Sequence, residues 1–335
     1  MRVGENPNKN IDSEISSVVY HRVIIPVYIP NLNDSYFKSS MEILRFNLES
    51  LLFTIHGRTR ITVVDNGCCD EVREYLKKMY NDFPLFDQLF HSKTNLGKIN
   101  AVYSGIKSNT EELITVTDAD VMFKPGWQHA VEEIFHEFPE AGMVSPVPHS
   151  MGFINFSNAT TYYGLFKGKL YFDTVRDPED LKKFENSIQR NILKPIHYRK
   201  YLVVDNGRAK GVMGCGHFVA TYRREVFSFA PNFPARDFLS TRSDNDYLDM
   251  PNDQGGFLRM ATLNNYGYHL GNVHEPWMEL ELKKIKEKPV EELYFDLPVP
   301  KPLTKTQYKI GWFFNRLLLH KFRKRFFKSK GVTGY

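Results

Sequence analysis

The sequence has few cysteines and no long hydrophobic run. It contains three cysteines, of which Cys68 and Cys69 are adjacent and Cys215 stands alone. This spacing offers no disulfide framework, so a reducing compartment is expected. The apolar runs, such as residues 23–25, are far shorter than the roughly 18 residues of a membrane span, and residues 1–17 lack the apolar core of a secretory signal. We therefore expect a cytoplasmic protein.

Acidic residues are absent from the end of the chain. Residues 301–335 contain ten Lys and Arg residues and no Asp or Glu. Because the whole chain has a net charge of +5 and this segment contributes +10, residues 1–300 carry −5. A body that binds nucleic acid usually has a basic surface of its own, so no nucleic-acid partner is expected.

The remaining composition is that of a globular protein. Hydrophobic residues make up 42% and charged residues 25%, which excludes the disordered and fibrous classes. Expected strands alternate with expected helices in the first 150 residues, and this alternation predicts an α/β fold with a mostly parallel, doubly wound sheet and helices on both faces. The strands are expected at residues 18–29, 60–64, 85–91, 112–117 and 143–146.

The pattern loosens after residue 150. We expect one strand over residues 211–222, a helix over 252–264 and a basic helix over 305–328. The expected organisation is a polar segment at 1–17, a nucleotide-binding half at 18–150, an acceptor-binding half at 151–282, a linker at 283–304 and a basic aromatic tail at 305–335.

Asp118-Ala119-Asp120 directly follows an expected buried strand. In a parallel sheet, ligands bind at the carboxyl ends of the strands. Two carboxylates separated by one residue can reach one hard cation there, and Mg²⁺ and Mn²⁺ prefer such oxygen ligands. The alternative is a pair of loop or capping aspartates.

Two weaker patterns stand at the neighbouring strand ends. Asp65-Asn66-Gly67 is a turn signal, although Asp65 is also placed to bond a nucleobase. The segment from Asn95 puts Gly97 and Lys98 at a helix entrance. Free backbone N–H groups and the helix dipole suit a phosphate or a ribose at such a position.

In their order along the chain, these motifs resemble glycosyltransferase family 2, whose members have the GT-A fold and use nucleotide sugars. The resemblance implies an inverting transfer that depends on Mn²⁺ or Mg²⁺. The donor would be a nucleotide-diphosphate sugar, with a UDP-sugar favoured over a GDP-sugar, and the acceptor a glycan or a lipid-linked molecule in cell-surface polysaccharide or glycoconjugate biosynthesis. The donor-binding residues it implies are Pro26, Tyr28, Asp65, Asn95, Gly97, Lys98, Asp118 and Ala119.

The resemblance extends into the second half of the chain. There it implies Asp253 as the catalytic base, in a segment similar to the family's Glu-Asp-x-Asp-Leu-x-x-Arg; the alternative is a helix cap. Asp244, Asp246 and Asp249 are nearby competitors, read as an acidic loop that binds acceptor or solvent. The acceptor side would comprise Gly214, Gly216, Asp246 and Asn252.

A histidine near the end of the domain often completes the metal site in this family. The resemblance therefore implies Asp120 and Asp118 as ligands together with His269, with His274 as the second choice. A structural histidine is the alternative.

Two other functions stay open from the sequence. One is a catalytically weak or scaffolding protein that binds a nucleotide sugar. The other is a sugar-phosphate nucleotidyltransferase, which would need a glycine-rich phosphate loop where Pro26-Val27-Tyr28-Ile29-Pro30 stands.

The tail can be drawn as a helix with Phe314, Leu318, Phe322 and Phe326 in one row at i, i+4 spacing. A basic, aromatic-rich helix suits an anionic membrane surface, which would place the protein peripherally at the inner face of the cell membrane. The alternative is a terminal helix that packs on its own domain or on a partner chain.

Overall fold

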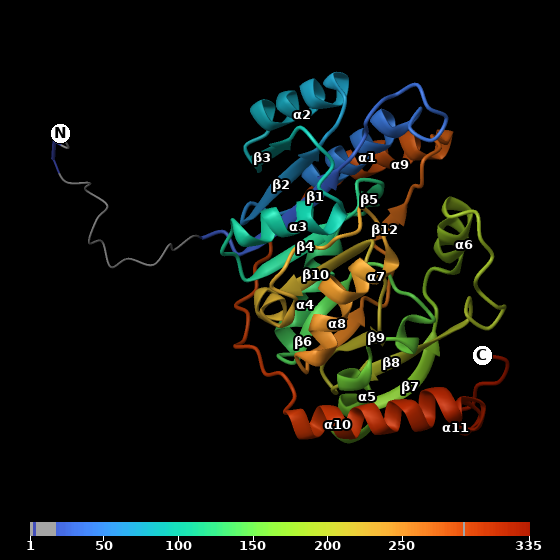
Figure 1. The fold of residues 1–335 in the computed structure, drawn as a ribbon. Helices are drawn as coiled ribbons and strands as arrows, with labels where there is room; N and C mark the ends of the chain where they lie inside the picture. The colour runs from blue at the N-terminus through green and yellow to red at the C-terminus, as the bar shows by residue number, and fades with distance from the viewer. Residues whose placement is uncertain (1–2, 5–17, 291) are drawn as a thin grey trace.

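The computed structural model describes residues 3–4, 18–290 and 292–335. Most of the polar segment expected at residues 1–17 therefore lies outside the described residues. Figure 1 shows α2 at one end of the molecule and the C-terminal helices α10 and α11 at the other, with the central sheet between them.

One mixed sheet of ten strands forms the centre of the described chain, in the order β3-β2-β1-β4-β10-β6-β11-β9-β8-β7. Most strands share one direction, and only β7, β9 and β10 run the opposite way. The strands are β1 (His21–Val27), β2 (Thr59–Asn66), β3 (Phe86–Ser92), β4 (Leu113–Thr117), β6 (Ala141–Ser145), β7 (Lys169–Thr174), β8 (Lys200–Asp205), β9 (Lys210–Met213), β10 (Val219–Arg223) and β11 (Leu258–Ala261). The expected α/β fold with a mostly parallel sheet is confirmed.

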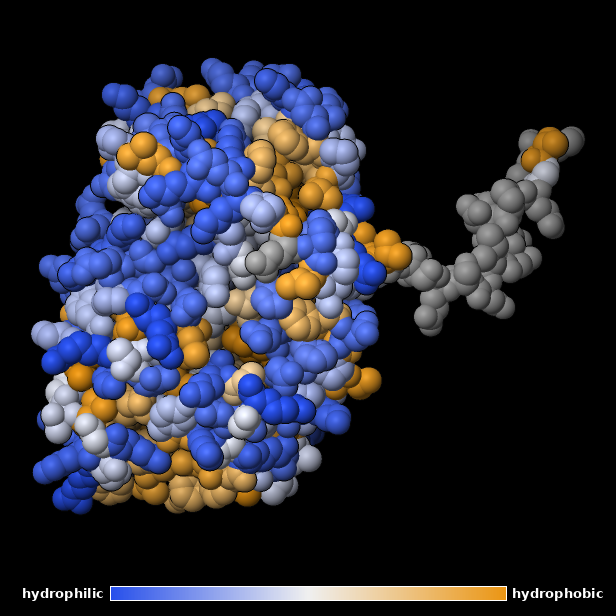
Figure 2. All heavy atoms as spheres, turned by 180° about the vertical axis from the view of Figure 1, so that it is seen from behind, coloured by the Kyte–Doolittle hydropathy of each residue, from blue (hydrophilic) through white to orange (hydrophobic). Residues whose placement is uncertain are grey.

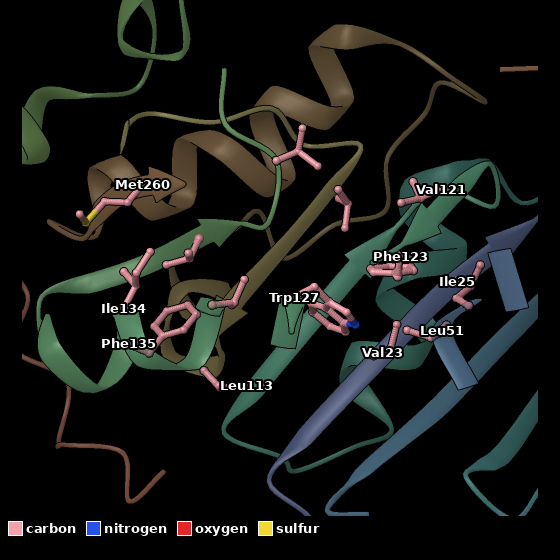
Figure 3. Close-up of a cluster of buried hydrophobic side chains, with 14 of the residues drawn as sticks. Val23, Ile25, Leu51, Leu113, Val121, Phe123, Trp127, Ile134, Phe135 and Met260 are labelled. Atoms are coloured by element: carbon pink, nitrogen blue, oxygen red, sulfur yellow. The ribbon is translucent and has the colours of Figure 1, made fainter. Parts of the chain in front are cut away.

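Helices cover both faces of this sheet. Val23 and Ile25 of β1 pack with α1, α2 and α4, whereas Ile24 packs with α3 on the opposite face. Figure 3 shows part of the first cluster, with Leu51 of α1 and Trp127 of α4 turned toward Val23. The helices are α1 (Ser40–Leu52), α2 (Asp70–Asp82), α3 (Lys98–Lys107), α4 (Trp127–Glu137), α5 (Asn158–Phe166), α6 (Pro178–Ser187), α7 (Thr241–Asp244), α8 (Met250–Gln254), α9 (Pro276–Lys286), α10 (Lys305–Phe314) and α11 (Arg323–Ser329).

The helix expected over residues 252–264 is wrong after its first three residues. The helix α8 ends at Gln254, and β11 then enters the sheet between β6 and β9. Gly256 adopts a φ of +81°, a conformation that ends the helix. Leu258 and Ala261 are buried on opposite faces of the sheet. Such an apolar run reads alike as a buried strand or a buried helix. The single strand expected over 211–222 is likewise two strands, β9 and β10.

The C-terminal segment is helical, as expected, and packs on the domain. The expected linker begins as the last turn of α9, and Leu303 N–H then donates to the Gly256 carbonyl at 2.9 Å. A π-helical stretch (Asn315–Lys321) joins α10 to α11. The buried side of α10 contains Gly311 and continues through Asn315 and Leu319, so the row expected to be apolar is not the buried one. Within the described residues, no helix has both the length and the hydrophobicity to cross a membrane.

Candidate active site

Four parallel strands end side by side at the edge that carries the sequence motifs. Val27 of β1 stands opposite Asp65 of β2, and Asp65 stands opposite His91 of β3. On the other side of β1, β4 ends just before Asp118. Parallel pairing therefore brings together motifs that are far apart in the sequence.

A cleft of about 420 Å³ opens at this edge. It is lined by expected residues Lys98, Asp118, Gly216 and His269 together with His217 and Asp244. Phe184 of α6 and Phe218 also line it, so the segment between residues 151 and 210 contributes a wall. Apolar rings beside a few convergent charged groups are typical of a small-molecule site.

The small two-stranded sheet brings a histidine to the Asp-x-Asp motif. β5 (Val121–Phe123) pairs with β12 (Gly267–His269), so that His269 stands opposite Val121. Its Nε2 lies 3.5 Å from Asp120 Oδ2. The Ser187 hydroxyl donates to the Phe184 carbonyl and lies 2.8 Å from His269 Nδ1. Because this hydroxyl already donates to a carbonyl, it accepts from His269 Nδ1–H, and this hydrogen bond turns Nε2 toward Asp120.

The carboxylates of Asp118 and Asp120 differ in their interaction partners. Asp118 Oδ1 forms an ion pair with Lys98 Nζ at 2.6 Å. Asp120 Oδ1 is buried without a hydrogen-bond partner. Burial raises the pKa of Asp120, and Asp118 adds to this while the charges of His269 and Lys98 oppose it. A buried carboxylate oxygen without a partner is costly unless a ligand or cation completes it.

These side chains fit a divalent metal that takes some of its ligands from the protein and the others from a substrate. The described residues contain no preassembled group of three or more metal-ligating side chains. Mg²⁺ is commonly held by one or two carboxylates plus substrate phosphates rather than by a complete protein cage. Asp118, Asp120 and His269 offer that kind of partial set. His274 is exposed and lies against Phe46, with ring centroids 5.4 Å apart.

On the expected nucleotide side, the Asp65 carboxylate is fixed by hydrogen bonds within the protein. Asp65 is 1% exposed, and its carboxylate accepts from Cys68 N–H at 2.9 Å and from His91 Nδ1 at 2.5 Å. Burial alone would raise the pKa of Asp65, but these hydrogen bonds lower it overall. Tyr28, just after the end of β1, is 43% exposed, and its ring meets the Phe37 ring edge-on with centroids 6.3 Å apart.

The expected free N–H groups at the helix entrance are not free. Leu96 N–H donates to Asn66, Gly97 N–H to Asn95, and Lys98 N–H to the Phe238 carbonyl. Gly97 has a φ of +83°, and a Cβ there would lie 2.8 Å from a backbone oxygen, so glycine is required for this packing. Of this motif, the Lys98 side chain is the part that lines the cleft.

A chain of charged groups continues from Lys98 into the second half of the protein. Lys98 Nζ lies 3.7 Å from Asp244 Oδ1, and His217 Nε2 lies 3.4 Å from Asp244 Oδ2. His217 Nδ1 bonds Asp249 at 2.9 Å, and Asp249 pairs with buried Arg259 at 3.1 Å. Burial raises the pKa of Asp244, while Lys98 and His217 partly offset that rise.

The expected base is not among the residues that line this cleft. Asp253 is 2% exposed, and its Oδ1 accepts from the N–H groups of Asn158 and Ala159 at the start of α5. Its Oδ2 accepts from Asn158 Nδ2 at 2.5 Å and from the Tyr308 hydroxyl at 3.1 Å. This carboxylate caps α5 and joins it to α10, which favours a structural role.

Of the other residues expected on the acceptor side, one lines the cleft and three do not. Gly216 lines the cleft. Gly214 is packed so closely that a Cβ would lie 2.1 Å from the Gly152 carbonyl oxygen. Asn252 is fully buried in α8, and Asp246 is half-exposed and pairs with Arg242 at 3.6 Å. None of these three lines the cleft.

The sequence assignment placed Asp244 only among the competitors of Asp253, and it gave His217 no role. Asp244-Asn245-Asp246 has the spaced carboxylates that the family segment requires, so a signal for Asp244 was present nine residues before Asp253. His217 has no comparable signal, because it is identified by its position between Asp244 and Asp249.

The family model described as Glycosyl transferase family 2 matches residues 26–228. This is more than half of the chain, and the chain therefore belongs to glycosyltransferase family 2. The match ends before Asp244 and Asp253, so it does not assign the base. The protein is a nucleotide-sugar glycosyltransferase with an α/β fold of the GT-A type.

Comparison with curated proteins gives no match. Among solved structures, S. aureus TarS 1–349 is similar over 82% of this chain and 67% of that chain, with 13% identity and a TM-score of 0.44. Its complex with UDP-GlcNAc matches 78% of this chain and 61% of that chain, with 12% identity and a TM-score of 0.45. The mannosyltransferase PcManGT from Pyrobaculum calidifontis, in complex with GDP-Man and Mn²⁺, matches 93% of this chain and 73% of that chain, with 14% identity and a TM-score of 0.42.

Proposed function

We propose that the protein is a metal-dependent, inverting glycosyltransferase in which Asp244, rather than Asp253, is the catalytic base. One observation supports this most strongly. Asp120 and Asp244 each keep a buried carboxylate oxygen without a hydrogen-bond partner, in and beside the cleft that Lys98 lines. Buried polar groups are ordinarily paired, so two spare acceptors at one cleft point to substrate and cation.

In this proposal the acceptor hydroxyl enters beside Asp244. Its oxygen attacks the anomeric carbon while its proton passes to the Asp244 carboxylate, and the nucleotide diphosphate leaves from the opposite face of the sugar. Lys98 and His217 favour the ionised form of Asp244 against burial, which keeps the base ready to accept a proton. Asp249 and Arg259 hold the His217 ring in place.

Asp118, Asp120 and His269 would hold Mn²⁺ or Mg²⁺, which neutralises charge on the leaving diphosphate. Lys98 adds a fixed positive charge on the same side. Tyr28, Asp65 and the residues near Pro26 and Asn95 would border the nucleotide. A UDP-sugar is favoured over a GDP-sugar, and the acceptor is a glycan or a lipid-linked molecule.

A thermal-shift screen of UDP- and GDP-sugars, each with and without Mn²⁺, tests the donor site. A ligand that binds only the folded state raises the unfolding temperature by mass action, so one donor class should stabilise the protein and do so only with the metal. No stabilisation by any donor would contradict the proposal.

The same donors then separate an enzyme from a scaffold. Slow hydrolysis of the stabilising donor in the presence of Mn²⁺ supports transfer chemistry. Binding of that donor without hydrolysis or transfer to any glycan acceptor would instead support a nucleotide-sugar-binding scaffold.

A further inference from the structure

The C-terminal helices have one face fixed to the domain. Gly311 lies so close to α5 that a Cβ would be 2.2 Å from the Asn158 carbonyl oxygen. Asn315 Nδ2 donates to Thr161 Oγ1 at 2.9 Å, and Leu319 and Phe327 are buried. The segment is therefore an integral layer of the fold, and removing it would uncover α5.

The opposite face of these helices is exposed and combines basic with aromatic side chains. We call it the tail face, defined by Lys309, Trp312, Phe313, Arg316, His320 and Lys321. All of these residues are exposed, and all except Lys309 line one surface groove, which places them on one side of the segment. Trp312 is 49% exposed and Phe313 54% exposed, and a shallow groove runs between them and Lys321.

Cationic groups lie directly beside these rings. The Arg316 guanidinium is 5.6 Å from the Trp312 ring, and Lys321 Nζ is 5.4 Å from the Phe322 ring. Figure 2 shows hydrophobic and hydrophilic atoms mixed along the lower edge of the molecule, where Figure 1 places α10 and α11. Residues 301–335 carry +10 while residues 1–300 carry −5, so positive charge is concentrated at this end.

We propose that the tail face docks on an anionic lipid membrane. Aromatic side chains favour the headgroup region, and flanking lysines and arginines are attracted by anionic lipids. A second copy of the chain is a poorer occupant, because a two-fold contact would press two faces of like charge together. Docking would bring the domain to a membrane-borne acceptor, but it does not depend on the transfer reaction.

Vesicle flotation of the full-length protein tests this inference. One set of vesicles contains phosphatidylcholine alone and the other contains phosphatidylcholine with phosphatidylglycerol. We expect binding to the second set only, weakened by salt through screening. The double variants Trp312→Ser/Phe313→Ser and Lys309→Glu/Lys321→Glu should each weaken binding about tenfold or more.

The matched control is Lys77→Glu/Lys78→Glu, which makes the same charge change on exposed positions of α2 at the far end of the molecule (Figure 1). It should bind like the unaltered protein. The proposal fails if the unaltered protein ignores anionic vesicles, if the tail-face variants bind normally, or if the control loses as much binding as they do.

A second measurement needs no change in the tail face. In a Trp277→Phe variant the remaining tryptophans are buried Trp127 and exposed Trp312. Anionic vesicles should then shift the emission to shorter wavelengths, and an unchanged spectrum would contradict insertion. Light scattering provides the remaining check, since a dimer that Trp312→Ser/Phe313→Ser dissociates would make this face a protein interface and overturn the proposal.

Discussion

Asp244 and Asp253 are both buried and only nine residues apart, yet their carboxylates have very different partners. Asp253 accepts hydrogen bonds on both oxygens from Asn158, Ala159 and Tyr308. Asp244 Oδ1 has no hydrogen-bond partner and lies 3.7 Å from Lys98 Nζ.

If Asp244 is the base, as we propose, the comparison identifies the property that separates a reactive carboxylate from a structural one. Burial raises the pKa of both aspartates, so the direction of the shift does not distinguish them. The hydrogen-bond partners of the two carboxylates do distinguish them. A carboxylate whose lone pairs are all used for capping has no room for an acceptor's proton, whereas one with a spare oxygen at a cleft has.

The largest expected effect comes from Asp244→Asn. The change keeps the shape of the side chain but removes its ability to take a proton, so kcat should fall about 10²–10⁴-fold. Steady-state transfer with saturating donor measures this. The control is Asp246→Asn, two residues away and outside the cleft, which should keep nearly normal activity. Equal losses in both variants would remove the special role of Asp244.

The second effect concerns Asp120, the other aspartate at the cleft with a carboxylate oxygen that lacks a hydrogen-bond partner. Asp120→Ala removes the proposed metal ligand, and we expect donor affinity in Mn²⁺ to fall about tenfold or more. Donor-induced thermal shifts measure the loss. His269→Ala should weaken metal-dependent binding as well, while His274→Ala should not. Metal-stimulated turnover that survives Asp120→Ala would contradict the assignment.

The third prediction sharpens the structural side of the comparison. Asp253→Asn replaces an acceptor with a donor beside Asn158 Nδ2 and Tyr308, so the free energy of unfolding should fall by about 1–3 kcal/mol. Tyr308→Phe should cost about 1 kcal/mol, because it removes one hydrogen bond to the same carboxylate. Denaturant titration measures both values. Unchanged stability in Asp253→Asn would show that the cap is not important.

The smallest expected effect is a shift in pH dependence. The value of kcat/KM should rise with pH as Asp244 loses its proton, at a pH above the ordinary range for aspartate because its pKa is raised. Burial would lower the pKa of His217, but Asp249 and Asp244 raise it overall and favour its cationic form. His217→Gln removes this cation and should move the acidic limb to higher pH by about one unit or less. The same limb in Asp253→Asn should stay in place.

The first half of the fold could be predicted from the sequence because strands and helices alternate there, apart from the short strand β5. That alternation placed Asp65 and Asp118 at one sheet edge. The sequence pattern did not predict β11, because this strand is buried on both faces of the sheet and its residues show no alternation of polar and apolar side chains. The tail row failed for another reason: Gly311 and Asn315, which are small or polar, face α5, so the buried side of the segment is already offset from Phe314 before the π-helical stretch is complete.

The base could not be chosen from the sequence alone. Asp244 and Asp253 both stand in segments with spaced polar residues, and chain order does not reveal which carboxylate turns toward Lys98. His217 was missed because its importance comes from contacts across the fold. Local motifs located this edge of the sheet, while the proposed choice of Asp244 depends on tertiary contacts.

The most direct test compares Asp244→Asn and Asp253→Asn in one buffer, with single-turnover transfer and unfolding temperature measured on the same samples. We expect Asp244→Asn to lose transfer and keep its unfolding temperature, and Asp253→Asn to keep transfer and unfold at a lower temperature. Loss of transfer in a stably folded Asp253→Asn protein, together with an active Asp244→Asn protein, would contradict the proposed role of Asp244.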